Sequence, residues 1–236
     1  VYFLNLQASI LSQSPTSLTI QVPYELTQPT QIAVQAGGIV YKTPSDFSPL
    51  SPWNKETNFP GGKRYGASSF TVGAYSYICM GIGQTGDRKD VWQYNPSNNS
   101  WTKKADYPGP SRAFSFSFVV NGKAYVGGGG HYGNSLYDLI NKHYDLWEYD
   151  PAADSWTQKQ SFSPNGLSNI EYVAATGIES YGYFIANNFL YRYDPSANQW
   201  SVSSSFPWSY SQGGVAVTIG NNGYFGLGFG NTTFWE

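Results

Sequence analysis

The stretch DLWEYDPAADSW, at residues 145–156, decides the fold because its pattern occurs three times in the chain. The other two copies read DVWQYNPSNNSW at residues 90–101 and FLYRYDPSANQW at residues 189–200. In each copy, nine positions separate the aromatic residue at the third place from the closing Trp. A fourth copy begins with Phe234, Trp235 and Glu236. Such repetition indicates a fold assembled from similar units.

Each full copy contains a turn signal. Asn95, Asp150 and Asp194 each precede a proline. An Asn or Asp side chain can accept a hydrogen bond from the backbone that follows, and proline presets φ for the next position of a type I turn. The pattern therefore predicts a hairpin between two strands in every repeat.

Two further elements recur outside this stretch. A tyrosine leads a Gly-rich or apolar strand before each copy, at Tyr77, Tyr125, Tyr183 and Tyr224. Glycines such as those at 127–130 permit close approach of backbones, and the alternation over 113–118 predicts a strand with one buried face. A Pro-containing segment that ends in arginine follows the Trp positions, at residues 59–64 and 107–112.

The order of these elements resembles that of kelch repeats, and it covers residues 53–236. The equivalent Trp residues at 53, 101, 156 and 200 are 48, 55 and 44 positions apart, which brackets the kelch repeat of about 50 residues. The resemblance implies an all-β fold, a kelch-type β-propeller of four-stranded antiparallel blades, with about three and a half blades in this chain. The third repeat departs from the family where Ala186 and Asn187 replace a diglycine.

The residues before the repeats differ in pattern. Residues 1–42 contain alternating segments at 17–23 and 31–38, typical of half-buried sandwich strands. This part resembles the C-terminal part of an immunoglobulin-like TIG (IPT) domain, and a Pro-rich linker at 43–52 separates it from the propeller. Because both ends of the chain fall inside such units, we expect it to be a fragment of a longer protein.

Composition excludes several classes of function. Only 12% of the 236 residues are charged and the net charge is -2, so no basic surface for nucleic acid is expected. One cysteine, Cys79, excludes an intrachain disulfide framework and a multi-thiolate metal site. No apolar stretch is long enough for a transmembrane segment. With 18% aromatic residues, this profile favours an extracytoplasmic protein, secreted or on the bacterial outer-membrane surface.

The candidate binding residues lie in loops that the repeat does not explain. The longest loop, residues 130–143, holds both histidines, and long loops on rigid scaffolds concentrate binding residues. The corresponding loop of the preceding repeat, residues 83–90, is short and charged, and residues 206–210 carry aromatics outside the framework positions. The candidates are His131, Tyr132, Tyr137, Asp138, His143, Asp87, Arg88, Trp208 and Tyr210. A solvated variable loop without a ligand is the competing interpretation.

No catalytic, metal or cofactor site is predicted. His131 and His143 lack a third metal ligand at a defined spacing, and the scattered carboxylates form no acid–base pair. Galactose oxidase and sialic acid mutarotases are kelch-type enzymes. The copper site of the former is not carried over because Cys79 lies in an expected core strand, and no catalytic residue matches the latter.

These observations lead to the expectation of a non-catalytic binding or scaffold protein of the bacterial cell surface. Its propeller face would engage a protein partner, as an accessory subunit of an outer-membrane complex. Glycan binding is the alternative, because Tyr132, Tyr137 and Trp208 could stack on a sugar. A carbohydrate-active enzyme with its site in further blades is the third interpretation.

Overall fold

The computed structural model describes residues 1–3, 6–14, 16–21, 30–36, 38–46, 55–132, 139–162, 173–186, 189–205, 213–228 and 233–236. All regular elements in these residues are β-strands, and neighbouring strands pair antiparallel. The chain divides into two compact units, Val1–Glu56 and Thr57–Glu236.

The first unit contains two small sheets. One has the order β2 (Leu6–Gln7), β1 (Tyr2–Phe3), β5 (Ile32–Ala36) and β6 (Ile39–Lys42), and the other pairs β3 (Ser9–Gln13) with β4 (Leu18–Gln21). Its described core is small and centres on Ala8, against which Val1, Leu6, Ile20 and Ile32 pack.

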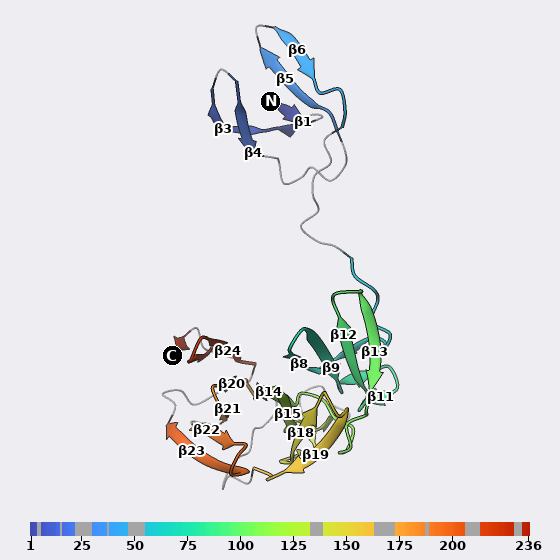
Figure 1. The fold of residues 1–236 in the computed structure, drawn as a ribbon, viewed down its shortest axis with the longest axis vertical. Coiled ribbons are helices and arrows are strands. Elements are labelled where there is room, and N and C mark those ends of the chain that lie inside the picture. Colours follow the sequence, from blue (N-terminus) through green and yellow to red (C-terminus); the bar gives the residue numbers. More distant parts are fainter. Residues whose placement is uncertain are drawn as a thin grey trace. The chain divides into compact units, whose positions relative to one another are not determined.

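The second unit is a succession of antiparallel sheets that we name blades 1 to 4, and Figure 1 shows them following one another around an arc. Blade 1 contains β8 (Ser68–Val72), β9 (Tyr75–Cys79), β12 (Val91–Asn95) and β13 (Ser100–Lys104). Blade 2 contains β14 (Phe116–Val120), β15 (Lys123–Gly127), β18 (Leu146–Asp150) and β19 (Ser155–Lys159). Blade 3 contains β20 (Ala175–Ile178), β21 (Tyr181–Ala186), β22 (Phe189–Asp194) and β23 (Gln199–Ser205). Blade 4 has β24 (Val215–Ile219), β25 (Asn222–Gly226) and β26 (Phe234–Trp235). The second unit is therefore all-β and propeller-like.

The repeated turns form as the sequence predicts. The backbone N–H of Ser97 donates to Asn95 Oδ1 at 2.9 Å, that of Ala152 donates to Asp150 Oδ1 at 2.9 Å, and that of Ser196 donates to Asp194 Oδ1 at 2.8 Å. These bonds close the hairpins between the third and fourth strands of blades 1, 2 and 3.

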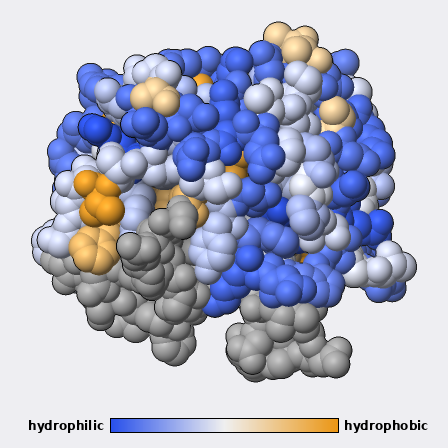
Figure 2. Space-filling model, turned by 90° about the horizontal axis from the view of Figure 1, so that it is seen from below, coloured by the Kyte–Doolittle hydropathy of each residue, from blue (hydrophilic) through white to orange (hydrophobic). Residues whose placement is uncertain are grey.

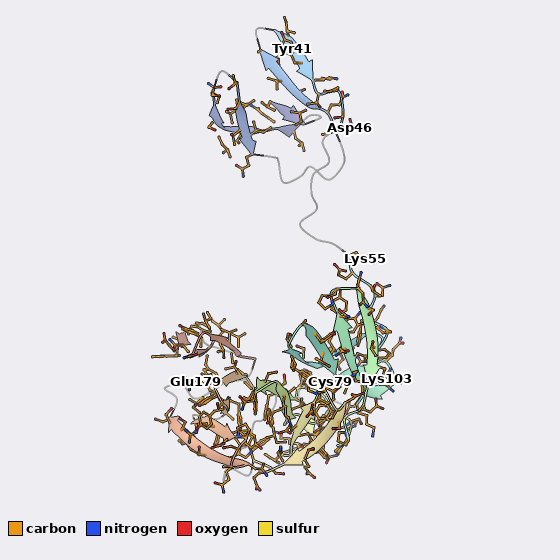
Figure 3. The ribbon with its side chains drawn as sticks, viewed as in Figure 1. Tyr41, Asp46, Lys55, Cys79, Lys103 and Glu179 are labelled. Carbon is orange, nitrogen blue, oxygen red and sulfur yellow. The ribbon has the colours of Figure 1, made fainter. Side chains whose placement is uncertain are left out.

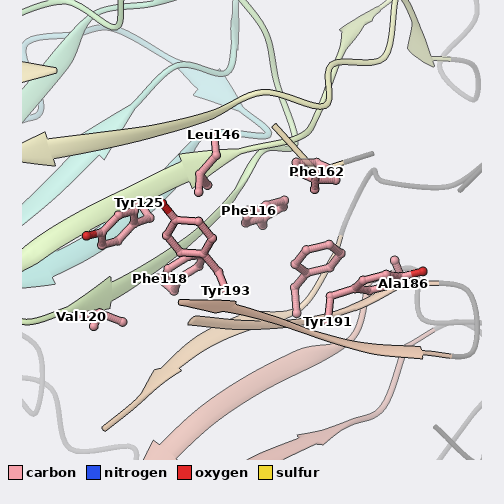
Figure 4. Close-up of a cluster of buried hydrophobic side chains, with 10 residues drawn as sticks. Phe116, Phe118, Val120, Tyr125, Leu146, Phe162, Ala186, Tyr191 and Tyr193 are labelled. Carbon is pink, nitrogen blue, oxygen red and sulfur yellow. The ribbon is translucent and has the colours of Figure 1, made fainter. Parts of the chain in front are cut away.

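The large buried clusters lie between blades. One joins blades 1 and 2 and contains Phe70, Tyr77 and Tyr149. The other joins blades 2 and 3, where Phe118, Tyr125 and Tyr193 take the equivalent places (Figure 4). Aromatic rings in such pairs contribute both buried area and favourable edge or stacked contacts. The repeated aromatics are thus framework residues whose burial holds neighbouring blades together.

A repeated set of hydrogen bonds adds to this packing. Asp154 Oδ1 accepts from the Tyr149 hydroxyl at 2.7 Å and from the backbone N–H of Ala105 at 3.0 Å, and the Trp156 indole donates to the Ala105 carbonyl at 3.0 Å. The residue that follows the last strand of blade 1 is thereby bonded to the outer hairpin of blade 2. Asn99 and Asn198 take the place of Asp154 in two equivalent sets of bonds. In these sets Thr57 and Gln160 take the place of Ala105, and the Tyr and Trp partners are Tyr94 with Trp101 and Tyr193 with Trp200.

The strand expected at 113–118 begins later than the alternation suggested. β14 starts at Phe116, while Phe114 has a φ of 58° and Ala113 forms an isolated bridge with Gly130. The chain bends there because the glycine segment approaches closely: a Cβ at Gly129 would lie 2.3 Å from the Ala113 carbonyl oxygen. Within β14 the expected single buried face is present, since Phe116 and Phe118 are buried.

The surface seen in Figure 2 is largely hydrophilic on the side where β19 and β23 lie in Figure 1. Among the described residues on this side, hydrophobic ones appear in small groups. The main hydrophobic packing of the described residues lies between the blades and not on this face.

Candidate functional site

Two loops of adjacent blades meet in the second unit. In blade 1, the connection from β9 to β12 contains β10 (Ile82–Gly83) and β11 (Gly86–Asp87), and β10 also pairs with β7 (Arg64–Tyr65). In blade 2, the equivalent connection from β15 to β18 contains β16 (His131–Tyr132) paired with β17 (Leu139–Ile140). Both loops therefore leave their blades after the second strand.

Asp87 and His131 join these loops directly. Asp87 Oδ2 and His131 Nδ1 are in hydrogen-bond contact. The Asp87 side chain is only 3% exposed, whereas that of His131 is 49% exposed. The contact is an ion pair when His131 is protonated, and it places two residues predicted from separate repeats at one point.

His143 lies at the base of the same blade 2 loop. Its backbone N–H donates to the Gly129 carbonyl at 2.9 Å. Burial lowers the pKa of His143, the positive charges of Arg112 and His131 lower it further, and Asp145 acts in the opposite direction. His143 is therefore a neutral imidazole near pH 7, able to donate and accept one hydrogen bond each.

Arg88 follows Asp87 and touches both blades through its backbone. Its N–H donates to the Gly81 carbonyl at 2.8 Å, and its carbonyl accepts from the Arg112 N–H at 3.4 Å. The side-chain Nε is buried without a hydrogen-bond partner among the described residues. The guanidinium packs on Gly83, where a Cβ would lie 2.6 Å from Nε.

A groove of about 440 Å³ borders this point. Lys103 forms part of its wall and lies on the outer strand of blade 1 (Figure 3). The lining residues, a mixture of charged, aromatic and turn residues, are Pro60, Gly61, Asp87, Arg88, Lys89, Asp90, Trp92, Lys103 and Asp106. A larger cavity of about 650 Å³ lies between blades 3 and 4, with Tyr183 and Trp235 among its lining residues and with none of the predicted site residues.

Two buried ion pairs beneath the loops escaped the sequence prediction. Arg112, whose side chain is fully buried, donates to both oxygens of Asp145 at 2.5 and 2.9 Å, and the Trp147 indole donates to the same carboxylate at 2.9 Å. Arg64 and Asp90 repeat this pair in blade 1. The signal was present, because both arginines lie eleven residues after a repeat Trp and both aspartates lie two residues before an aromatic of the repeat. Their bonding within the repeat assigns them to the framework.

The remaining predicted site residues lie in β16 or outside the described residues. Tyr132 belongs to β16, and Tyr137, Asp138, Trp208 and Tyr210 lie outside the described residues.

The described residues include one thiol and two histidines, whose surroundings the structure shows. The described part of the chain contains no group of three or more His, Cys, Asp or Glu side chains that could hold a metal ion. Cys79 is fully buried within blade 1 (Figure 3), and burial raises the pKa of its thiol to about 12. A thiol with such a pKa is protonated near pH 7 and is a poor nucleophile. Among the described residues, there is also no helix long and apolar enough to cross a membrane.

Comparisons with known proteins show the fold and nothing narrower. No known family profile matches the chain. No curated protein sequence matches it either. Among solved structures 170 chains match, and one of them is the structure of YjhT, with 22% identity and a TM-score of 0.61. The match covers 79% of this chain and 64% of the YjhT chain. This likeness supports the propeller-like architecture of the second unit.

Proposed function

We propose that this protein is a non-catalytic binding or scaffold protein of the bacterial cell surface, in which the loop face of a kelch-type propeller engages a protein partner. The observation that carries the proposal is the joining of two loops from adjacent blades through Asp87 and His131, beside a groove with charges of both signs. Interspersed charges give a protein interface its specificity and its orientation.

Three narrower parts of the proposal rest on other features. The kelch type is supported by the equivalent register of Tyr77, Tyr125 and Tyr183, which face Gln93, Glu148 and Arg192 in their sheets. The assignment of residues 1–42 to a TIG-like sandwich is supported by the short antiparallel strands of the first unit. An extracytoplasmic location, as an accessory subunit of an outer-membrane complex, is supported by composition alone.

Site-specific photocrosslinking in cells that naturally make the protein tests this function. A benzoylphenylalanine at Gln84, an exposed residue in the turn between β10 and β11, should give a discrete protein adduct. The same group at Gln158, an exposed residue on β19, is the control and should give none. Equal adducts from both positions, or none from either, would contradict the proposal.

Glycan binding is the second candidate, and the aromatic side chains of Tyr183 and Trp235 beside the larger cavity favour it. Alanine at Tyr183 and Trp235, and in a second variant at Tyr132, Tyr137 and Trp208, separates glycan binding from protein binding. Loss of retention on immobilised glycans, with the Gln84 adduct unchanged, would favour the glycan.

A further inference from the structure

Arg88 differs from the other two arginines at this end of the blades. Arg64 and Arg112 each direct both terminal nitrogens to one carboxylate, on Asp90 and Asp145. In the described residues, the Arg88 side chain has neither an ion pair nor a hydrogen bond. A guanidinium presents five donors in a planar fork that matches a carboxylate. Arg88 thus presents a fork without its usual counterpart.

The position of this guanidinium is set by its surroundings. It packs on Gly83, where a Cβ would lie 2.6 Å from Nε and 2.9 Å from Nη2. Gly83 is itself held in the small sheet, paired with Arg64 and Gly86. The Arg88 backbone is also hydrogen-bonded to Gly81 and Arg112, so several contacts position this residue in the wall of the groove.

Apart from Asp87, whose contact with His131 is an ion pair only when the imidazole is protonated, the groove charges that have no ionic counterpart are positive. Asp90 is paired with Arg64 at 2.7 Å, Asp106 with Lys103 at 3.2 Å, and Asp87 contacts His131. Arg88 and the exposed Lys89 also line the groove, and within the described chain neither forms an ion pair. The ligand that complements this groove is therefore an anion.

We propose that the groove binds an acidic peptide segment of the protein partner, with one carboxylate on the Arg88 fork and a second near Lys89. This inference rests on the proposed function and specifies its partner. Two separate cations along one groove fit a chain with several carboxylates better than a single small acid. Arg–carboxylate hydrogen bonds are charge-assisted and often bidentate, so the fork gives the contact its geometry as well as its strength.

Binding of a fluorescein-labelled hexaglutamate peptide to the whole chain, followed by anisotropy at low salt, tests the inference. Hexaglutamine is the uncharged control peptide. Arg88→Gln should weaken hexaglutamate binding about tenfold or more, because it removes a charge-assisted pair. Lys42→Gln, the same loss of charge at an exposed residue of the first unit, should leave binding unchanged. Arg88→Lys keeps the charge but loses the fork, and it should bind more weakly than the wild type.

A second variant changes the position of the Arg88 guanidinium and leaves its charge in place. Gly83→Ala should also weaken binding, because the added methyl group displaces the guanidinium while Arg88 stays in the chain. Thermal unfolding of each variant verifies that it is folded under the conditions of the binding assay.

Several outcomes would overturn the inference. If the wild type and Arg88→Gln bind hexaglutamate equally, Arg88 does not bind the peptide. If the wild type binds hexaglutamine as tightly as hexaglutamate, the carboxylates do not contribute to binding. Tighter, Arg88-dependent binding of a hyaluronan tetrasaccharide would replace the peptide with an acidic sugar. If hexaglutamate does not bind but the Gln84 adduct forms, this inference fails and the proposed function stands. If the wild type gives no adduct at Gln84, the proposed function itself fails.

Discussion

Blades 1 and 2 each contain a buried Arg–Asp pair, which we call the anchor, and the sequence of blade 3 has uncharged residues at the same places. In blade 2, Arg112 pairs with Asp145, which also accepts from the Trp147 indole. In blade 3, the residues at the places of Asp145 and Trp147 are Phe189 and Tyr191, and the sequence has Leu167 at the place of Arg112. Tyr191 is buried and stacks on Phe184 at 4.9 Å.

In the sequence, blade 3 lacks both charged members of the anchor together, and Phe189 at the place of Asp145 is 43% exposed. A buried charge without its partner costs several kcal/mol, whereas a complete replacement by packed apolar residues is often neutral. Blade 4 gives an intermediate case, since the Trp235 indole donates to Thr233 Oγ1 at 3.0 Å, where blades 1 and 2 use an aspartate. The hydrogen bond to the indole can therefore persist with a neutral acceptor.

The largest effect is expected from breaking the anchor of blade 2. Arg112→Ala should lower the free energy of unfolding by about 3–5 kcal/mol, because it leaves Asp145 partly buried without its cation. Urea denaturation measures this. Arg192→Ala in blade 3 is the control, because Arg192 lies over the Tyr181 ring at 4.7 Å and lacks an ion pair among the described residues, so its loss should be about 1 kcal/mol.

A second experiment replaces the anchor of blade 2 with the residues that the sequence of blade 3 has at the same places. Arg112→Leu combined with Asp145→Phe and Trp147→Tyr should recover most of the stability lost in Arg112→Ala. A combined variant as unstable as Arg112→Ala would show that the two versions are not interchangeable.

A smaller effect is expected at the inner ends of the blades, where blade 2 has Gly129 and the sequence of blade 3 has Asn187. Gly129 has a φ of 73° and the Ala113 carbonyl close by, while Gly122 has the same φ of 73° with no atom within 4 Å of the place that a methyl group would take. Both alanine variants acquire the cost of a left-handed conformation, but only Gly129→Ala adds a clash, so it should lose roughly 1–3 kcal/mol more than Gly122→Ala. Thermal unfolding of both variants decides this, and equal losses would contradict the close approach.

The smallest effect concerns pH. Burial alone would raise the pKa of Asp145, but its hydrogen bonds and charge interaction with Arg112 hold that pKa below its ordinary value. A lowered pKa contributes stability above the unfolded-state value of about 3.9, and this contribution is lost as pH falls through the folded-state pKa. Asp145→Asn leaves the buried Arg112 without its anion and so lowers stability at neutral pH, and the small effect predicted here is that it also flattens the fall in stability below about pH 4. If the slope of stability against pH is the same in Asp145→Asn as in the wild type, Arg112 does not lower the pKa of Asp145. Blade 3 has Phe189 at this place, which has no ionisable group.

Much of the fold could be predicted from the sequence because the repeat reports local and pairwise physics. Asn95, Asp150 and Asp194 specify their turns through bonds to residues two positions away. The register of the framework tyrosines follows from their places in alternating strands. The start of β14 could not be predicted, because the positive φ of Phe114 depends on a glycine segment that approaches from further along the chain.

The candidate site shows the same division. The loops and several of their residues, including Asp87, Arg88, His131 and His143, could be selected because they interrupt a repeat of known pattern. Their mutual geometry could not. Asp87 and His131 are 44 positions apart, and no local rule brings them into contact.

By itself, the sequence determined that the chain is built from β-repeats, where the turns lie and which aromatics are framework, since these depend on neighbours in the chain and on strand alternation. Only the tertiary structure decided that Arg112 and Asp145 form a buried pair, that Asp87 contacts His131, and that Arg88 lies in the wall of the groove. These are contacts between blades and loops, and their distances depend on how complete sheets pack against one another.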